Sequence, residues 1–96
     1  MEIAQNILNQ LGNGKFIAMT GAKNFVSKSN GLQFRLPRYS HTKINTVSVD
    51  LVNDVYSLTF YNIRGVKVKE LDSVDGVYAE DLQRVFTNKT GLNTSL

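Results

Sequence analysis

The segment KINTVSVDLVNDVYSLTFYNIRGVKVKEL, residues 43–71, alternates apolar and polar side chains on both sides of a tight turn. Its inward positions are Val47, Val49, Leu51, Tyr56, Leu58 and Phe60. A period of two is typical of strands with one dry face and one wet face. We therefore predict an antiparallel hairpin that turns at residues 52–55 and leaves one face of a sheet open to solvent.

Two segments before this hairpin are predicted as strands, and a third, short segment is an alternative outside the count of five. Residues 15–20 contain four consecutive apolar side chains, which suits a strand covered on both sides. Residues 32–36 alternate and end at Pro37, a residue that stops a strand or marks a sheet edge. A short strand at residues 24–27 would pair with residues 32–36 through the turn signal at residues 29–31.

One more strand is predicted after the hairpin. Ile63 breaks the alternation, so we expect a bulge or a strand end there. The alternation resumes at residues 66–71, after a turn at Arg64-Gly65. Its inward residues are Val66 and Val68, and its outward residues are Lys67 and Lys69. Residues 72–76 are predicted to form a loop.

Amphipathic helices are predicted at both ends of the chain. Residues 2–11 place four apolar side chains on one stripe, and Gly12 follows where a left-handed C-cap needs glycine. The second helix covers residues 78–90, with acids in its first turn, a lysine in its last turn and Gly91 beyond it. Its apolar stripe consists of Tyr78, Leu82, Val85 and Phe86.

Both helices need a dry surface, and the sheet has one. We therefore predict a single α+β domain over residues 1–96 with the element order α-β-β-β-β-β-α. It is a two-layer fold, in which an antiparallel sheet of about five strands carries both helices on one face. The residues expected on the opposite, wet face are Gln33, Arg35, Thr46, Ser48, Ser57, Thr59, Tyr61, Lys67 and Lys69.

The composition narrows the functional classes. The chain has no cysteine, which removes disulfides, thiolate catalysis and cysteine-ligated metal sites together. No apolar run approaches the roughly 20 residues that span a bilayer. The N-terminus lacks the basic start and apolar middle of a signal peptide. We expect a cytoplasmic protein that does not associate with membranes.

Residues that could carry out catalysis are few and scattered. His41 is the only histidine, and no metal-ligand spacing such as HxH or HExxH surrounds it. The acidic pair Glu80-Asp81 is explained by its place at a helix start. We therefore predict a protein that is not an enzyme and that holds no cofactor and no metal. A deep pocket collecting several polar side chains would favour an enzyme instead.

The net charge of +3 conceals an asymmetry along the chain. Residues 15–49 contain six cations and no acid, whereas residues 50–96 contain seven acids and five cations. A segregated charge of this kind indicates an anionic partner, and an outward aromatic residue can stack an unpaired base of DNA or RNA. The predicted nucleic-acid-binding residues are Lys23, Lys28, Arg35, Arg38, Tyr39, Lys43, Tyr61, Lys67 and Lys69.

Two other interpretations of these residues stay open. In the plainer one, the lysines keep the protein soluble and Tyr61 packs against its cross-strand neighbours. In the other, the protein is an interaction module whose basic segment, residues 35–43, occupies a groove of a host or phage protein. Exposed edge strands could also pair with a second copy, which makes a homodimer an alternative assembly.

The segments KFIAMTGAKNF (15–25), LQFRLP (32–37) and the C-terminal residues 76–92 occur together in this chain. With them, nearly the whole chain resembles a family of small uncharacterised proteins encoded by bacteriophages and other bacterial mobile elements. The resemblance implies a host-cell cytoplasmic setting and brings no activity, cofactor or catalytic residue. In element order alone, the strands followed by a C-terminal helix are similar to single-stranded-DNA-binding transcriptional coactivators.

Overall fold

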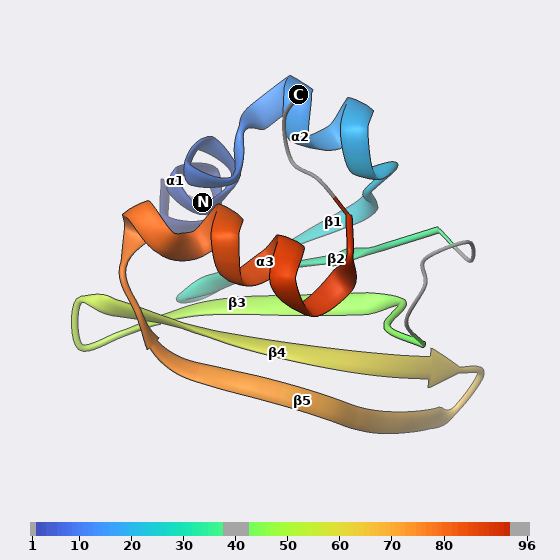
Figure 1. The fold of residues 1–96 in the computed structure, drawn as a ribbon. Coiled ribbons are helices and arrows are strands. Elements are labelled where there is room, and N and C mark those ends of the chain that lie inside the picture. Colours follow the sequence, from blue (N-terminus) through green and yellow to red (C-terminus); the bar gives the residue numbers. More distant parts are fainter. Residues whose placement is uncertain (1, 38–42, 93–96) are drawn as a thin grey trace.

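The computed structural model describes residues 2–37 and 43–92 as two layers, with the helices stacked on one side of a five-stranded sheet (Figure 1). The elements in chain order are α1 (Glu2–Leu11), α2 (Asn13–Thr20), β1 (Lys23–Lys28), β2 (Gly31–Arg35), β3 (Thr46–Val52), β4 (Val55–Arg64), β5 (Lys67–Val77), the short 3-10 helix η1 (Ala79–Asp81) and α3 (Leu82–Thr90). The predicted two-layer α+β class is therefore confirmed, with both terminal helices on the same face of the sheet.

The strands follow one another across the sheet in chain order, each antiparallel to the next. The predicted hairpin is confirmed: Val47 lies opposite Phe60 and Val49 opposite Leu58, and all four side chains are buried. Its turn residues Asn53 and Asp54 have φ angles of 51° and 66°. Two consecutive positive φ angles match the right-handed twist of a two-residue hairpin, and asparagine and aspartate tolerate them best among non-glycine residues.

The core lies between the helices and one face of the sheet. Phe16 of α2 is fully buried and packs edge-on against Phe34 of β2, with ring centroids 5.3 Å apart, and against Phe86 of α3, at 5.2 Å. Edge-to-face packing is a favoured geometry for aromatic pairs. This aromatic cluster, Phe16, Phe34 and Phe86, joins three elements that are far apart in the sequence.

The strand predicted at residues 15–20 is wrong, because this segment is the helix α2. Phe16 and Thr20, four residues apart, are buried, whereas Ile17 between them is 37% exposed. The spacing is that of a helical turn. Gly21 then ends the helix in the left-handed conformation, with its N–H donating to the Ile17 carbonyl oxygen at 2.9 Å. The predicted number of strands still holds, since the short strand proposed at residues 24–27 is present as β1.

The predicted loop at residues 72–76 is also wrong, since β5 continues through it to Val77. The predicted facing of its first half is wrong too: Val66 lies in the turn and is 98% exposed, and Val68 is 63% exposed. Lys69 lies opposite Asn62 and Lys67 opposite Arg64, on the side of the sheet that carries the helices.

The physical reason is a bulge. Between the pairs Phe60–Asp72 and Tyr61–Glu70, the register shifts and Leu71 becomes the extra residue of β5. One extra residue reverses the side that every strand position beyond it faces, which here means the positions before Leu71 in the chain. The irregularity predicted at Ile63 is therefore displaced to the Phe60–Tyr61 step, and β4 itself continues to Arg64.

The second predicted helix is confirmed in its buried stripe and its end, but not at its start. Tyr78 is 60% exposed and extended, because the chain first passes through η1 before α3 begins. Leu82, Val85 and Phe86 are buried as predicted. Gly91 is left-handed and donates its N–H to the Thr87 carbonyl oxygen, which is the predicted C-cap.

One ion pair joins α3 to β5, and we expect it to make the free energy of unfolding depend on pH. Lys89 Nζ lies 2.6 Å from Asp72 Oδ2, and the hydrogen bonds from Lys89 and from the Ser73 N–H hold the pKa of Asp72 below its ordinary value. Because the folded pKa is the lower one, the contribution is complete above the unfolded pKa of about 3.9 and is lost as pH falls through the folded pKa.

We therefore expect Lys89→Met to lower the urea midpoint at neutral pH, and the two proteins to converge as the pH falls well below about 4. The matched control is Arg84→Met, which removes an exposed pair with Asp81 whose atoms are 3.4 Å apart. Exposed pairs of this kind contribute little, so the control should follow the wild-type curve at every pH. A constant difference between Lys89→Met and wild type down to strongly acidic pH would contradict the assignment.

Candidate functional site

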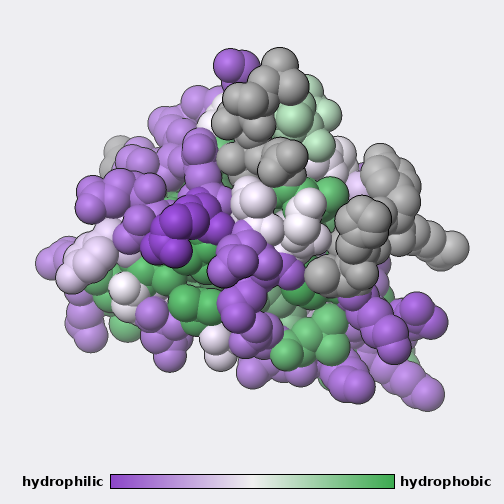
Figure 2. Space-filling model, viewed as in Figure 1, coloured by the Kyte–Doolittle hydropathy of each residue, from purple (hydrophilic) through white to green (hydrophobic). Residues whose placement is uncertain are grey.

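A basic groove lies at one end of the sheet, where β2 ends, β3 begins and β4 turns into β5. Its volume is about 820 Å³. Four cationic side chains line it: Lys23, Arg35, Lys43 and Arg64. Hydrophilic side chains cover this end of β4 and β5 on the visible surface (Figure 2). We call this depression the basic groove.

The strand register brings these four cations together. Lys23 at the start of β1 lies opposite Arg35 at the end of β2. Thr46 lies opposite Tyr61 in the central hairpin. Lys43 lies three residues before Thr46, and Arg64 lies three residues after Tyr61. Both residues therefore reach the same end of the sheet. Residues from four separate parts of the chain thus line one concavity.

The charge of the basic groove is uncompensated. None of the described residues that line it is an acid. The ion pairs formed within residues 2–37 and 43–92 are Lys28–Asp50, Arg84–Asp81 and Lys89–Asp72, and no groove cation takes part in them. Like charges that share a concavity repel one another and raise the local concentration of anions. The arrangement is therefore suited to binding an anionic group.

Asparagine side chains hold the walls of the groove in place. Asn45 Nδ2 donates to the Ile63 carbonyl oxygen, and Asn45 Oδ1 accepts from the Ile63 N–H, both at 2.9 Å. Asn62 Nδ2 donates to the Lys43 carbonyl oxygen at 2.6 Å. These bonds join the ends of β3 and β4, so the backbone that carries Lys43 and Arg64 is fixed before any ligand arrives. A site that is already in shape loses less conformational entropy on binding.

The predicted nucleic-acid-binding residues separate into groups. Lys23, Arg35 and Lys43 line the basic groove. Tyr61 is half-buried on the face of the sheet away from the helices, in the same cross-strand row as Arg35, with Thr46 between them. Arg38 and Tyr39 lie outside the described residues, as does His41.

Three other predicted cations do not join this group. Lys28 forms an ion pair with Asp50 at 2.8 Å and donates to Ser48 Oγ, so its charge is already compensated. Lys67 and Lys69 lie on the helix side of the sheet because of the bulge at Leu71, so the prediction that they share the wet face is wrong.

The wet face itself is less open and less basic than predicted. Thr46 and Ser48 are only 1% and 2% exposed, and Lys28 of β1 donates to Ser48 Oγ. The strand pairing also places Glu70 opposite Tyr61, beside the predicted binding surface. The sheet face is therefore a mixed surface, and the basic groove at its end is where unpaired cations gather.

The sequence interpretation missed Arg64, which was assigned only to a turn. The signal was present in the hairpin itself. With a two-residue turn at Asn53 and Asp54, the residue numbers of every facing pair in the hairpin have the same sum, as in the pair Thr46–Tyr61. The same arithmetic sets Arg64 opposite Lys43.

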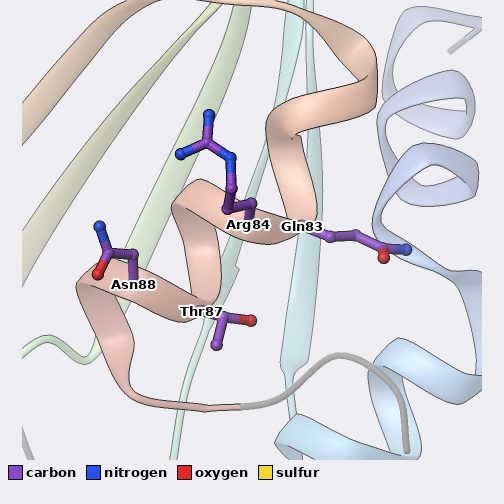
Figure 3. A pocket seen from close by; sticks show the side chains of 4 residues that line it. All are labelled: Gln83, Arg84, Thr87 and Asn88. Carbon is purple, nitrogen blue, oxygen red and sulfur yellow. The ribbon is translucent and has the colours of Figure 1, made fainter.

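A second depression of about 600 Å³ is shallow and is lined from α3 alone, by Gln83, Arg84, Thr87 and Asn88 (Figure 3). Gln83 Nε2 donates to the Leu11 carbonyl oxygen at 3.0 Å and thereby ties α3 to α1. The four side chains include no carboxylate, histidine or lysine, so they offer no acid–base pair.

Within the described ranges, no three histidine or acidic side chains gather as a metal site would require. None of the helices in that part of the chain has the length and apolarity to span a membrane.

Comparisons of the chain with protein-family models, with curated proteins and with solved structures found no match. The resemblance to proteins of bacteriophages and mobile elements therefore stays a prediction. The candidate function rests on the geometry and charge of the basic groove.

Proposed function

We propose that this protein is a non-enzymatic accessory protein that binds nucleic acid, in the cytoplasm of a cell that hosts a phage or mobile element. The observation that carries the binding proposal is the basic groove: four cations, no acid, and walls held by amide hydrogen bonds. Phosphate groups are the anions that such a cluster binds regardless of base sequence.

Tyr61 adds a second contact to this proposal. It lies two strands from Arg35 in one cross-strand row, a separation of about 10 Å at the usual strand spacing. A phosphate held at Arg35 leaves the adjoining base within reach of the tyrosine ring. Base stacking on an aromatic side chain contributes about 1–3 kcal/mol and is tolerant of sequence.

Titration of a labelled single-stranded oligonucleotide at several salt concentrations tests the charge contribution. If four phosphates are neutralised, the logarithm of the binding constant should fall with the logarithm of salt with a slope of about −3. Arg35→Ala and Arg64→Ala should each weaken binding about tenfold and make the slope shallower by about 0.7.

The matched control is Arg84→Ala, which removes the same charge from α3, outside the basic groove. It should leave affinity nearly unchanged. Equal losses for Arg84→Ala and Arg35→Ala would mean that only net charge matters, and the groove would be rejected as the site. No measurable binding at low salt, where electrostatic affinity is greatest, would reject the function itself.

Tyr61→Leu separates stacking from charge. The substitution keeps an apolar side chain on β4 and removes the aromatic ring. Affinity for the single strand should fall about tenfold, while the salt slope stays at its wild-type value. A changed slope together with unchanged affinity would contradict a stacking role.

The second candidate, a protein-interaction module, is favoured by one specific feature. The edge strand β5 is long, and two exposed valines lie at its start: Val66 in the preceding turn and Val68 in the strand. The chemistry of this edge points to a particular partner.

A further inference from the structure

The outer edge of β5 is the open edge of the sheet. This strand has 11 residues, and β4 is its one neighbour among the strands of residues 2–37 and 43–92. The opposite edge, β1, has six residues and a register break between Lys23 and Val26, whereas β5 pairs with β4 without a break over residues 67–70 and again over residues 72–74. A short edge offers few pairing groups to another chain, whereas a long edge with exposed apolar side chains favours pairing.

The charges of β5 are segregated along its length. Its first part carries Lys67 and Lys69, Glu70 lies between the two parts, and its last part carries Asp72 and Asp75. Two copies paired in parallel would set lysine against lysine and aspartate against aspartate. Two copies paired antiparallel set the basic part of each against the acidic part of the other. Opposite charges across a strand pair are stabilising and like charges are destabilising.

The bulge at Leu71 decides which antiparallel registers are allowed. Residues that face each other across a strand pair must lie on the same side of the sheet. Lys69 and Asp72 both lie on the helix side, opposite Asn62 and Phe60 of β4. Val68 and Ser73 both lie on the other side, opposite Ile63 and Thr59.

A register that pairs residue 69 with 72 therefore also pairs 68 with 73 and 67 with 74, and the faces of these three pairs match. A slip of one residue would put these positions opposite partners on the other side of the sheet. A slip of two residues in one direction sets Lys69 opposite Val74 and loses both cross-chain ion pairs. In the other direction it sets Lys67 opposite Asp72, but it also sets Lys69 opposite Glu70, and these two residues lie on different sides of the sheet.

From this match we propose that β5 pairs antiparallel with β5 of a second copy of this chain, with the two-fold axis between Glu70 and Leu71. The two sheets then form one continuous sheet. Lys69 of each copy lies opposite Asp72 of the other. Asp72 already accepts from Lys89 and from the Ser73 N–H, and an ionised carboxylate has capacity for a further donor. A two-fold pairing of identical surfaces also closes on itself and does not propagate into a fibre.

The absence of cysteine from the chain makes the axis directly measurable. Single cysteines are introduced at four exposed positions on the reverse side of β5: Val68, Glu70, Ser73 and Asp75. Glu70→Cys places two thiols on either side of the axis and should form a disulfide dimer on mild oxidation. The other positions lie five or more residues from their own copies, about 17 Å or further, beyond the reach of a disulfide. Equal cross-linking at all four positions, or a maximum away from residue 70, would overturn the register.

Sedimentation of the unmodified protein, without nucleic acid, tests the dimer itself. The dimer fraction should rise between micromolar and millimolar protein. Lys69→Glu sets like charges against Asp72 twice and should weaken the dimer roughly tenfold. The matched control is Lys23→Glu on β1, which changes the charge equally and should leave the dimer intact. A protein that stays monomeric at millimolar concentration, or equal losses for the two variants, would end the proposal.

Discussion

Phe34→Ala is expected to lower the free energy of unfolding by about 3–5 kcal/mol. The side chain is fully buried at the centre of the core. Its ring centroid lies 5.3 Å from that of Phe16, 5.6 Å from that of Phe25 and 6.1 Å from that of Phe86. Removing it leaves a cavity bounded by α2, β1 and α3, which cannot all close in at once. Urea unfolding followed by circular dichroism measures the loss.

The loss expected for Phe34→Ala is a large share of the total free energy of unfolding. Domains of this size are stable by about 5–15 kcal/mol, so the variant should be partly unfolded or strongly shifted in its midpoint. Phe25→Ala is the matched control, because Phe25 is half-buried on the edge strand β1 and its one ring partner among the described residues is Phe34. The Phe25→Ala variant should lose clearly less stability than the Phe34→Ala variant. Equal losses for the two variants would mean that Phe34 is not the centre of the core.

Gly31→Ala is expected to cost about 1–3 kcal/mol or more, the second largest effect. Gly31 begins β2 and lies opposite Asp50 of β3. A Cβ built there would overlap the Val49 carbonyl oxygen and lie 3.0 Å from Asp50 Cα. These are backbone atoms of a central strand, so they cannot move aside without breaking ladder hydrogen bonds. The clash, and not an unusual φ angle, is the reason that glycine is needed there.

Gly14→Ala provides the comparison for this second prediction. A Cβ at Gly14 meets nothing within 4 Å, and the residue lies inside the helix α2. Alanine should therefore stabilise the protein by about 0.5–1 kcal/mol, because glycine loses more backbone entropy in a helix. We expect the two substitutions to change the free energy of unfolding in opposite directions when both are measured by the same urea titration. Destabilisation by Gly14→Ala would contradict the prediction at residue 14, and unchanged stability for Gly31→Ala would contradict the clash with β3.

Local patterns predicted much of the fold because they depend on near neighbours in the sequence. The alternation at residues 46–61 is confirmed as β3 and β4, in the register that the turn at Asn53 and Asp54 sets. The first helix ends as predicted at Leu11 before Gly12, and the last ends at Thr90 before Gly91. In each of these places, period and end signals agree.

Two of the wrong predictions have different physical reasons. The apolar run at residues 16–19 fits a strand or a helix equally well, and only packing against Phe34 and Phe86 selects the helix. The alternation at residues 66–71 is real, but the bulge at Leu71 reverses which side it faces. A bulge depends on the partner strand, so a single segment does not reveal it.

The sequence by itself determined which parts of this chain form helices and strands where period and capping agree, that residues 15–49 carry cations without acids, and that the fold has two layers. Only the tertiary structure decided which cations meet. Lys23, Arg35, Lys43 and Arg64 line one groove because four strand ends converge at the same end of the sheet, whereas Lys67 and Lys69 do not line it. The physical reason is that the residue type sets the charge of a side chain, whereas the register between strands sets which side chains lie close together.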